Sequence, residues 1–314
     1  MFDATKFIEE TIESSENNIK GRAVAATSGG VDSTVATVIL SRAIGDDLLS
    51  IYVDTGLMRK GEKEYVEKTL AGLDVNYEIV DARDEFFGAL KGVIDPEEKR
   101  KVIGRTFIEI FERKAKEFGA SYLIQGTIAP DWIESGGDLR DTIKSHHNVG
   151  ALPKEMELEL IEPLRDLYKD EVRKVARELG VSVSERQPFP GPALAIRILG
   201  EVTPEAAETA RDACAIVEEE IERSAEMEGV ELPWQYFAGL LPIRSVGVRG
   251  DIRAYGFTVF IRAVQSVDGM TASYSKLPHD VLDRISIRIT NELPQVNRVV
   301  YDITNKPPGT IEWE

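Results

Sequence analysis

A run of small residues between an apolar stretch and a helical pattern constrains this chain most. Residues 28–33 read Ser-Gly-Gly-Val-Asp-Ser; the apolar run Ala23–Ala26 precedes them, and a helix-spaced pattern over Val31–Ala43 follows. This order predicts a strand, a tight turn and then a helix. Glycines let the backbone approach an anion closely, and a helix N-terminus offers unpaired N–H groups and a favourable dipole. The run therefore predicts a phosphate-binding loop.

The loop differs from the common P-loop, which ends in Gly-Lys-Ser/Thr. Asp32 stands at the expected helix start, where a carboxylate could hold a metal ion against phosphate oxygens, and the hydroxyls of Ser28 and Ser33 add donors. The pattern resembles the PP-loop, SGGxDS, of the ATP pyrophosphatase superfamily. Those enzymes cleave ATP between the α and β phosphates and adenylate an oxygen of a second substrate. Taken alone, the two glycines are also compatible with a simple turn.

Strand and helix patterns alternate along the first half of the chain. Strands are predicted at Ala23–Ala26, Leu48–Val53, Asn76–Val80 and Tyr122–Ile124. Helices are predicted at Val31–Ala43, Glu62–Leu70, Glu97–Phe118 with Gly119 as a cap, and Lys169–Leu179. This alternation indicates a mostly parallel sheet covered on both faces. Ligands of such sheets bind beyond the carboxyl ends of the strands. The loops Ser28–Ser33, Asp54–Gly56 and Gly126–Thr127 are all expected at that edge.

The segment Ile128–Leu152 interrupts the alternation and is polar and glycine-containing, which is typical of an active-site lid or a disordered loop. It contains Lys144 beside two histidines, and a lysine closing over a polyphosphate would neutralise charge on departing pyrophosphate. Asp131 and Glu134 are candidates for holding magnesium or orienting the acceptor. Solvated loop histidines are the alternative interpretation of His146 and His147.

Three prolines within Gln187–Pro192 exclude a regular helix and predict a domain boundary, with domains at 1–187 and 188–314. The second domain reads as a smaller α+β unit, with helices at Pro204–Met227 and His279–Glu292 and strands at Ile243–Val248, Thr258–Ser266 and Arg298–Ile303. The tail Asn305–Glu314 combines Pro-Pro, a turn glycine and a tryptophan. We interpret it as a fixed tail that plugs a site; docking of Trp313 onto the core is the alternative.

Composition excludes several classes of function. The 314 residues carry a formal net charge of -17, which argues against nonspecific nucleic-acid binding. No apolar run is long enough for a membrane span. Cys214 is the only cysteine, so an internal disulfide framework and cysteine zinc clusters are excluded. A reducing cytoplasm fits this cysteine content, and we expect Cys214 at a helical core position.

The basic cluster Lys99–Lys101 could bind a phosphate, but a solvated helix turn with internal ion pairs is the favoured interpretation.

Longer stretches make a more specific resemblance. The chain resembles the ATP pyrophosphatase subunits of GMP synthetase, in the form whose glutaminase is a separate polypeptide. The matching stretches span nearly the whole chain: 28–33, 52–56, 96–104, 125–127, 130–135, 143–149, 162–165, 187–192, 245–248, 267–271, 297–302 and 306–314. The stretches at 187–192 and 306–314 are far more specific than the PP-loop, which many families share.

The resemblance implies an α/β fold: a parallel-sheet PP-loop domain, adenine nucleotide alpha hydrolase-like, followed by a smaller α+β dimerisation domain of a homodimer. It implies that Mg²⁺ and ATP adenylate xanthosine monophosphate (XMP), and that ammonia from a separate glutamine amidotransferase subunit then displaces AMP to give GMP. The implied ATP-binding residues are Ser28, Gly29, Gly30, Val31, Asp32 and Ser33, with Asp32 near magnesium. Lys144, Asp131 and Glu134 would act in the closed lid. The implied XMP-binding residues are Arg100, Gln235, Asp251, Lys306, Ile311 and Glu312.

Five residues near the expected binding loops depart from the family's usual pattern: Thr55, Ala129, Ala151, Ala193 and Ser273. Ala193 stands where a glycine is common. The nearest alternatives are other PP-loop enzymes, namely NAD synthetase, argininosuccinate synthetase and tRNA thiolation enzymes. The last generally need paired cysteines and a basic surface, which this chain lacks. A noncatalytic nucleotide-binding protein is the alternative from another class; the presence of both Asp32 and Lys144 argues against it.

Overall fold

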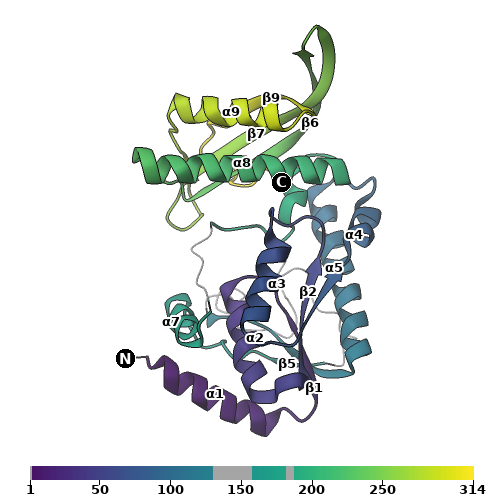
Figure 1. Cartoon of the computed structure of the whole chain (residues 1–314), viewed down its shortest axis with the longest axis vertical. Coiled ribbons are helices and arrows are strands. Elements are labelled where there is room, and N and C mark those ends of the chain that lie inside the picture. The colour runs from purple at the N-terminus through teal and green to yellow at the C-terminus, as the bar shows by residue number, and fades with distance from the viewer. Residues whose placement is uncertain (1, 130–157, 182–186) are drawn as a thin grey trace. The chain divides into compact units, whose positions relative to one another are not determined.

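The computed structural model of the chain describes residues 2–129, 158–181 and 187–314 (Figure 1). They form two compact units. The first is built from Met1–Thr55, Gly61–Arg83 and Ile103–Glu185, and the second from Gly56–Lys60, Asp84–Val102 and Arg186–Glu314. Two early segments of the chain therefore belong with its C-terminal part, which periodicity and composition did not indicate.

The first unit contains a five-stranded, fully parallel sheet with the order β3-β2-β1-β4-β5. The strands are β1 (Arg22–Ala26), β2 (Leu48–Asp54), β3 (Tyr77–Asp81), β4 (Ala120–Ile124) and β5 (Glu159–Ile161). The apolar strands β1 and β2 are almost wholly buried, as a sheet covered on both faces requires. The predicted parallel α/β sheet is confirmed. Chain order along the sheet reverses between β1 and β4, which makes the ends of these strands the switch point where ligands bind.

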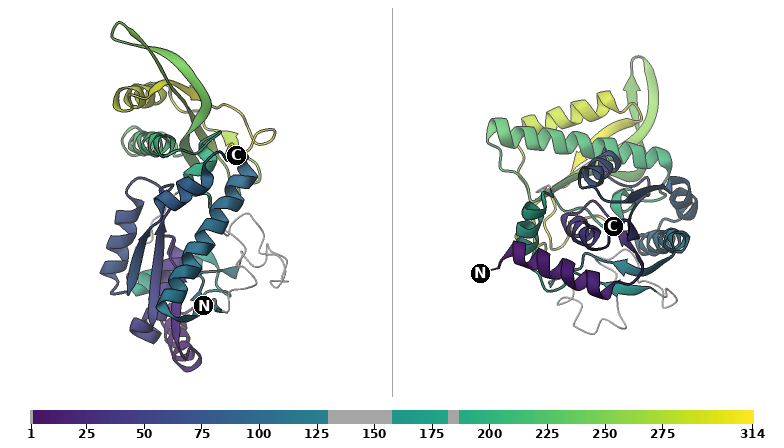
Figure 2. Two further views of the ribbon diagram at one scale, coloured as in Figure 1. Left: turned by 90° about the vertical axis from the view of Figure 1, so that its right-hand side faces the viewer. Right: turned by 60° about the horizontal axis from the view of Figure 1, so that its bottom comes forward.

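Helices cover this sheet on both sides (Figure 2). They are α1 (Ala4–Asn18), α2 (Val31–Ile44), the short η1 (Gly45–Asp47), α3 (Glu62–Gly72), α7 (Lys169–Leu179) and most of α5 (Pro96–Phe118). Helices α1, α2 and α7 pack against one another over the apolar core. The predicted glycine at the end of α5 is confirmed, since Gly119 takes a φ of +73°, and Gly180 likewise ends α7 with a φ of +75°.

The second unit is α+β, as predicted. Besides α4 (Arg83–Leu90) and the first turns of α5, it contains η2 (Ala193–Arg197), α8 (Pro204–Glu228), β6 (Gln235–Arg249), β7 (Ile252–Gln265), β8 (Ser273–Tyr274), α9 (His279–Glu292) and β9 (Val296–Tyr301). Strands β6 and β7 form an antiparallel hairpin, β8 pairs antiparallel with β7, and β9 pairs parallel with β7. Helices α8 and α9 pack on one another, and their ion pairs centre on the buried Glu220.

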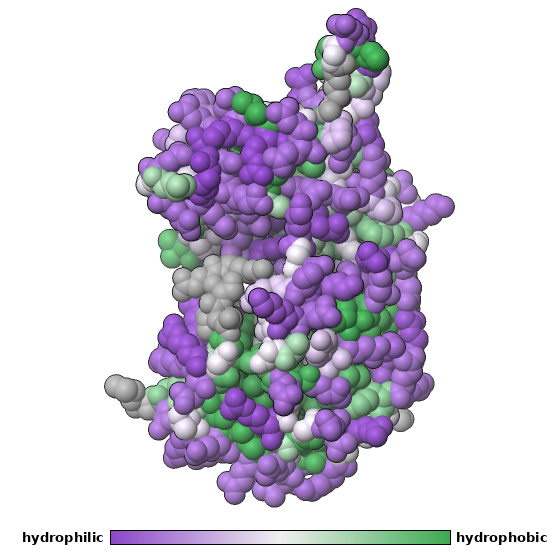
Figure 3. Space-filling view, in the orientation of Figure 1, coloured by the Kyte–Doolittle hydropathy of each residue, from purple (hydrophilic) through white to green (hydrophobic). Residues whose placement is uncertain are grey.

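Strand β6 begins eight residues before the predicted start at Ile243. Proline is a strand breaker by local preference, but a register shift between Leu241 and Arg244 accommodates Pro242. Beyond this shift β6 and β7 continue as a two-stranded arm, residues 244–256, that projects from the sheet (Figures 1 and 3). The arm carries exposed apolar side chains: Val248 is 73% exposed and Tyr255 72%.

The described helices include none with both the length and the apolar character of a bilayer span.

Candidate functional site

The loop after β1 has the predicted strand–turn–helix form. Strand β1 ends at Ala26, Gly30 is the N-cap of α2, and the helix starts at Val31. Side chains hold the loop: the hydroxyls of Ser28 and Ser33 lie 3.2 Å apart, and Ser33 Oγ donates to the carbonyl oxygen of Gly30 at 3.0 Å. The residues from Ser28 to Ser33 thus gather around one helix N-terminus, where backbone N–H groups favour an anion.

Two glycines are required by the packing of this loop. Gly29 has a φ of +83°, and a Cβ there would lie 2.7 Å from Val66 Cγ2. A Cβ on Gly126 would lie 2.8 Å from the backbone carbon of Asp32 and the nitrogen of Ser33. The end of β4 therefore lies directly against the first turn of α2, and Gly126 brings the loops after β1 and β4 together at the switch point.

Asp32 is the charged residue of this loop, and its partner is Lys169 at the start of α7. Lys169 Nζ donates to Asp32 Oδ2 at 2.6 Å. Asp32 Oδ1 is buried and has no hydrogen-bond partner among the described residues. Sequence reasoning missed Lys169, because its partner is 137 positions away and the periodicity of α7 indicated only a helix start.

The surroundings of Asp32 fit a magnesium ion held jointly with a substrate. The described part of the chain contains no cluster of three or more acidic, histidine or cysteine side chains that would hold a metal alone. Magnesium, however, is commonly bound by one or two carboxylates together with substrate phosphates. The unpartnered Oδ1 of Asp32 is one such oxygen, at the helix terminus where phosphates are favoured.

In the second unit, the C-terminal residues are anchored on buried groups. Arg197 is fully buried and donates to Glu312 from Nη2 at 2.8 Å and from Nε at 3.1 Å. Burial alone would lower the pKa of Arg197, but the adjacent Glu312 carboxylate outweighs it and raises the pKa, so the guanidinium stays charged. Trp313 stacks on Phe260 with ring centroids 4.2 Å apart. The docking of Trp313 onto the core is confirmed.

The basic cluster at the start of α5 separates into two environments. Arg100 and Lys101 form ion pairs with Glu97 and Glu98 at 2.6 and 2.7 Å, the i,i+3 pairs of the favoured interpretation. Lys99 instead points inward and is fully buried. Its Nζ donates to the carbonyl oxygens of Ala195 at 3.2 Å and Ile198 at 2.6 Å, and it pairs with Glu314.

The residues implied in XMP binding do not all lie together. Gln235 Nε2 donates to Glu312 Oε1 at 2.8 Å, and Ile311, which precedes Glu312 in the chain, is buried. Lys306 pairs through its backbone with Ala272, and its Nζ donates to the carbonyl oxygen of Gly269 at 2.7 Å. Asp251, in contrast, lies in the turn of the arm, whereas Gln235 begins β6 at the other end of the hairpin.

The residues predicted to act in the lid, Lys144, Asp131 and Glu134, lie outside the described residues.

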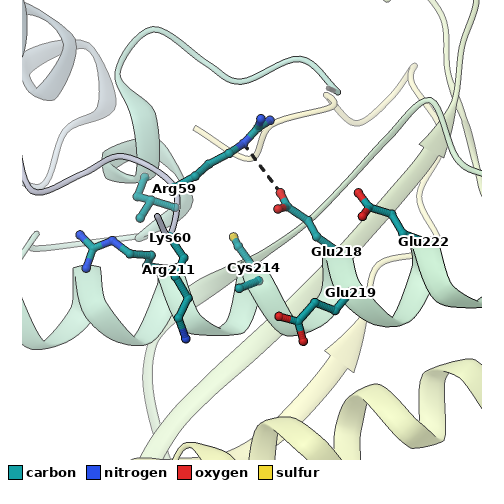
Figure 4. A pocket seen from close by; sticks show the side chains of 9 residues that line it. Arg59, Lys60, Arg211, Cys214, Glu218, Glu219 and Glu222 are labelled. Atoms are coloured by element: carbon teal, nitrogen blue, oxygen red, sulfur yellow. Dashed lines mark ion pairs between the residues drawn. The ribbon is translucent and has the colours of Figure 1, made fainter. Parts of the chain in front are cut away.

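A cavity of about 220 Å³ lies between the loop Gly56–Lys60 and α8 (Figure 4). Arg59 forms an ion pair with Glu218 at 3.8 Å, Lys60 pairs with Asp212 at 2.8 Å, and Arg211 donates to the carbonyl oxygen of Met58 at 3.0 Å. Burial raises the pKa of Glu218. These contacts fasten the segment that follows β2 onto α8.

Cys214 also lines this cavity, and its expected core position on a helix is confirmed. It is buried on α8, and its Sγ donates to the carbonyl oxygen of Ala238 at 3.0 Å. Burial raises the pKa of the thiol, so it is protonated and structural.

Among the positions that depart from the family pattern, Ala193 has a clear structural consequence. Its φ is +55°, in the left-handed region that favours glycine. Its backbone N–H donates to the carbonyl oxygen of Pro190 at 2.9 Å, which holds the residue in this conformation. The alanine is therefore strained as the first residue of η2.

Comparison with known proteins connects this geometry to a family. Residues 219–313 match the family model described as GMP synthase C terminal domain. Three archaeal relatives carry the name of glutamine-hydrolyzing GMP synthase, each as the subunit designated B. That of Thermoplasma acidophilum is 56% identical over 310 residues, covering 99% of each chain. That of Pyrococcus furiosus is 59% identical, covering 98% of this chain and 97% of the relative. That of Methanopyrus kandleri is 55% identical, covering 100% of both.

Proposed function

This chain belongs to the B-type subunits of glutamine-hydrolyzing GMP synthase, and we propose that its residues activate XMP with ATP and aminate it to GMP. The enzyme is a ligase of GMP biosynthesis. The observation that carries the residue-level proposal is the loop Ser28–Ser33, which presents a helix N-terminus and a carboxylate at the switch point of a parallel sheet.

The chemistry explains why ATP is needed. The O2 oxygen of XMP belongs to a urea-like carbonyl and is a poor leaving group. Its attack on the α phosphorus of ATP forms the oxygen–phosphorus bond as the bond to the β-phosphate oxygen breaks and pyrophosphate departs. Ammonia then adds to the activated carbon, loses a proton, and AMP leaves with the former O2 oxygen. ATP is thus consumed as a co-substrate and converted to AMP and pyrophosphate.

In this proposal the PP-loop binds the phosphates of ATP. The backbone N–H groups at the start of α2 and the hydroxyls of Ser28 and Ser33 donate to them, and negative charge grows on the departing pyrophosphate. Asp32 would hold Mg²⁺ through Oδ1. The ion supplies positive charge that neutralises the phosphates. Lys169 fixes the other carboxylate oxygen and contributes a further cation near the same phosphates.

We assign the lid role to Lys144, Asp131 and Glu134, which lie outside the described residues. Lys144 would neutralise pyrophosphate in the closed lid, and the two carboxylates would orient the acceptor or a metal ion. Replacing Lys144 with alanine should then lower the rate of adenylation and leave unfolding unchanged. Adenylation at the wild-type rate in this variant would remove Lys144 from the mechanism.

We propose an ATP pyrophosphatase domain at 1–187 and a C-terminal domain at 188–314, and we propose the acceptor site in the second unit, which also contains Arg100. Arg100 and Lys306 would supply cations for the phosphate of XMP. Gln235, Ile311 and Glu312 would surround the nucleotide, and the contact between Gln235 and Glu312 supports a shared site. Local cations of this kind are needed for a dianionic substrate, because the chain as a whole carries a net charge of -17.

We further propose a homodimer that brings Asp251 to this site. The 15 residues of β6, at roughly 3.3 Å each, place Asp251 on the order of 45 Å along the strand from Gln235. One nucleotide can contact both residues only if Asp251 comes from a second copy. The exposed apolar side chains of the arm support such an interface, because a two-stranded hairpin is marginally stable alone.

Ammonia would come from a separate glutamine amidotransferase subunit. The relatives are named as one lettered subunit of a glutamine-hydrolyzing enzyme, which supports this partner. The single cysteine of the chain is buried and structural, so it does not offer a glutaminase nucleophile. We propose that the reaction takes place in the cytoplasm. Oxidising compartments favour disulfide bonds, and a chain with one cysteine cannot form an internal disulfide.

An assay with purified chain, Mg-ATP, XMP and ammonium tests the proposal. We expect GMP, AMP and pyrophosphate in equal amounts. Turnover with deamido-NAD, or with citrulline plus aspartate, and none with XMP would instead identify another PP-loop ligase. Nucleotide binding without any turnover would identify a noncatalytic protein.

A further inference from the structure

The last three residues of the chain alternate between two environments. Glu312 and Glu314 pair with the buried cations Arg197 and Lys99, whereas Trp313 stacks on Phe260 and donates to Asp302 at 2.9 Å. These contacts come from three consecutive residues, so the short segment is held at each of its side chains. The two acidic residues contact the buried cations, and the tryptophan between them contacts the ring of Phe260.

Both cations are buried so completely that they need these carboxylates. Burial lowers the pKa of Lys99, while its hydrogen bond and attraction to Glu314 act in the opposite direction. The ammonium group has three donors, and it has three acceptors: the carbonyl oxygens of Ala195 and Ile198, and Glu314. An unpaired buried charge is strongly unfavourable, so loss of the carboxylate would destabilise the docked position of the tail.

We propose that Lys99 and Arg197 are positioning residues whose pairs with Glu314 and Glu312 lock the C-terminal tail into the form that binds the acceptor nucleotide. Lys99 has no exposed surface and no remaining donor, so it acts through the tail rather than by contacting substrate. This inference rests on the proposed function of the acceptor site.

The lock connects the segments that carry the proposed acceptor ligands. Lys99 directly precedes Arg100 in the first turns of α5, and its partner Glu314 ends the tail that contains Lys306. Arg197 holds Glu312, which also accepts from Gln235. Releasing Glu314 would therefore free the tail relative to Arg100 and would weaken binding of the acceptor. The four residues of the lock belong to the second unit and the PP-loop residues to the first, so binding of ATP should not change.

The decisive variant is Glu314→Gln, which keeps the size and an acceptor oxygen but removes the charge. We expect the KM for XMP, and its Kd measured by calorimetry, to rise about tenfold, because a neutral amide leaves the charge of Lys99 uncompensated. The KM for ATP should stay within about twofold. The midpoint of thermal unfolding should fall by no more than about 3 °C, because the tail can leave its docked position while the core stays folded. Glu314→Asp, which retains the charge, should recover part of the affinity.

The matched control is Glu98→Gln, which removes the exposed pair with Lys101 near the start of the same helix and should change neither KM. An unchanged Kd for XMP in Glu314→Gln would overturn the lock, and so would an equal rise in both KM values. If the wild-type chain binds and aminates XMP, either of these results for Glu314→Gln contradicts the lock and leaves the proposed function intact. If the wild-type chain does not use XMP, the proposed function fails and the lock falls with it.

Discussion

Lys169 Nζ lies 2.6 Å from Asp32 Oδ2, so the first residue of α7 contacts the second residue of α2. Asp32 is well placed for its own helix, because an acid stabilises the positive end of the helix dipole. Lys169 is not, because a cation in the first turn opposes the dipole of α7. The pair with Asp32, rather than the dipole of α7, therefore accounts for the position of the Lys169 side chain.

Replacing Lys169 with methionine should raise the KM for ATP and lower kcat with ammonium, together by about tenfold in kcat/KM. The reason is the loss of a cation beside the proposed phosphate-binding loop. Lys174→Met is the control, since Lys174 lies on the same helix and forms an ion pair with Asp170 at 3.5 Å, away from the loop. Steady-state kinetics of both variants measure the effect on kcat/KM for ATP. Equal effects of the two substitutions would contradict a specific role of Lys169.

Gly126→Ala should abolish most adenylation activity. Its Cβ would lie 2.8 Å from backbone atoms of Asp32 and Ser33, so the start of α2 must shift away from the position that presents its N–H groups. Pyrophosphate release measures this effect. Gly72→Ala at the end of α3 meets no atom within 4 Å and should leave the rate unchanged. An active Gly126→Ala enzyme would show that the close approach of β4 to α2 is dispensable.

Ala193→Gly should stabilise the protein by about 0.5–1 kcal/mol. The alanine occupies a φ of +55°, and glycine adopts this conformation without steric cost. The reverse change, Gly180→Ala at a φ of +75° with no atom within 4 Å, should destabilise by about 1 kcal/mol for the same reason. Urea unfolding gives both values. A destabilised Ala193→Gly variant would mean that packing of the methyl group outweighs the strain.

The packing of α8 against α9 should weaken in acid. Burial alone would raise the pKa of Glu220, but hydrogen bonds from Arg223, Arg288 and Arg284 outweigh it and lower the pKa below its ordinary value. A carboxylate with a lowered folded pKa binds fewer protons than in the unfolded chain. Its contribution is therefore complete above its ordinary pKa of 4.5 and is lost as the pH falls through the folded pKa.

Glu220→Gln should accordingly cost about 2 kcal/mol at pH 7 and show a shallower loss of stability below about pH 4.5. Denaturant unfolding at a series of pH values measures both. The control Glu219→Gln removes an exposed partner of Arg288 and should change stability by less than about 0.5 kcal/mol. Parallel pH profiles for wild type and Glu220→Gln would show that this carboxylate does not drive the acid loss.

The proposed dimer should depend on the arm. Tyr255→Glu places a charge on an exposed apolar surface and should shift the protein toward monomer, with loss of XMP binding if Asp251 acts across the interface. Sedimentation and calorimetry measure the two effects. Met227→Glu changes an equally exposed apolar residue at the end of α8 and should leave both unchanged. A Tyr255→Glu protein that remains dimeric would exclude the arm as the interface.

Local signals in the sequence are sufficient for much of the architecture. They predict helix α9 at its observed bounds, His279–Glu292, because apolar periodicity and the flanking residues agree there. They predict strand β6 too short, because Pro242 is a local breaker that only pairing with β7 compensates. Helix α1 is missed although its sequence carries the signals: Asp3 caps its start, and Phe7, Ile8 and Ile12 form an apolar face that packs on the core.

The form of the loop at residues 28–33, the proposed phosphate site, is determined by the sequence alone, because its glycines, hydroxyls and helix start are contiguous and act through the backbone they belong to. The prolines and tryptophan of residues 305–314 likewise indicate a fixed tail. Only the tertiary structure decided which charges meet. Lys169 with Asp32, Lys99 with Glu314 and Arg197 with Glu312 are each separated by more than a hundred residues. Ion pairing depends on distance in space and on burial, and neither is encoded in the local pattern around either partner.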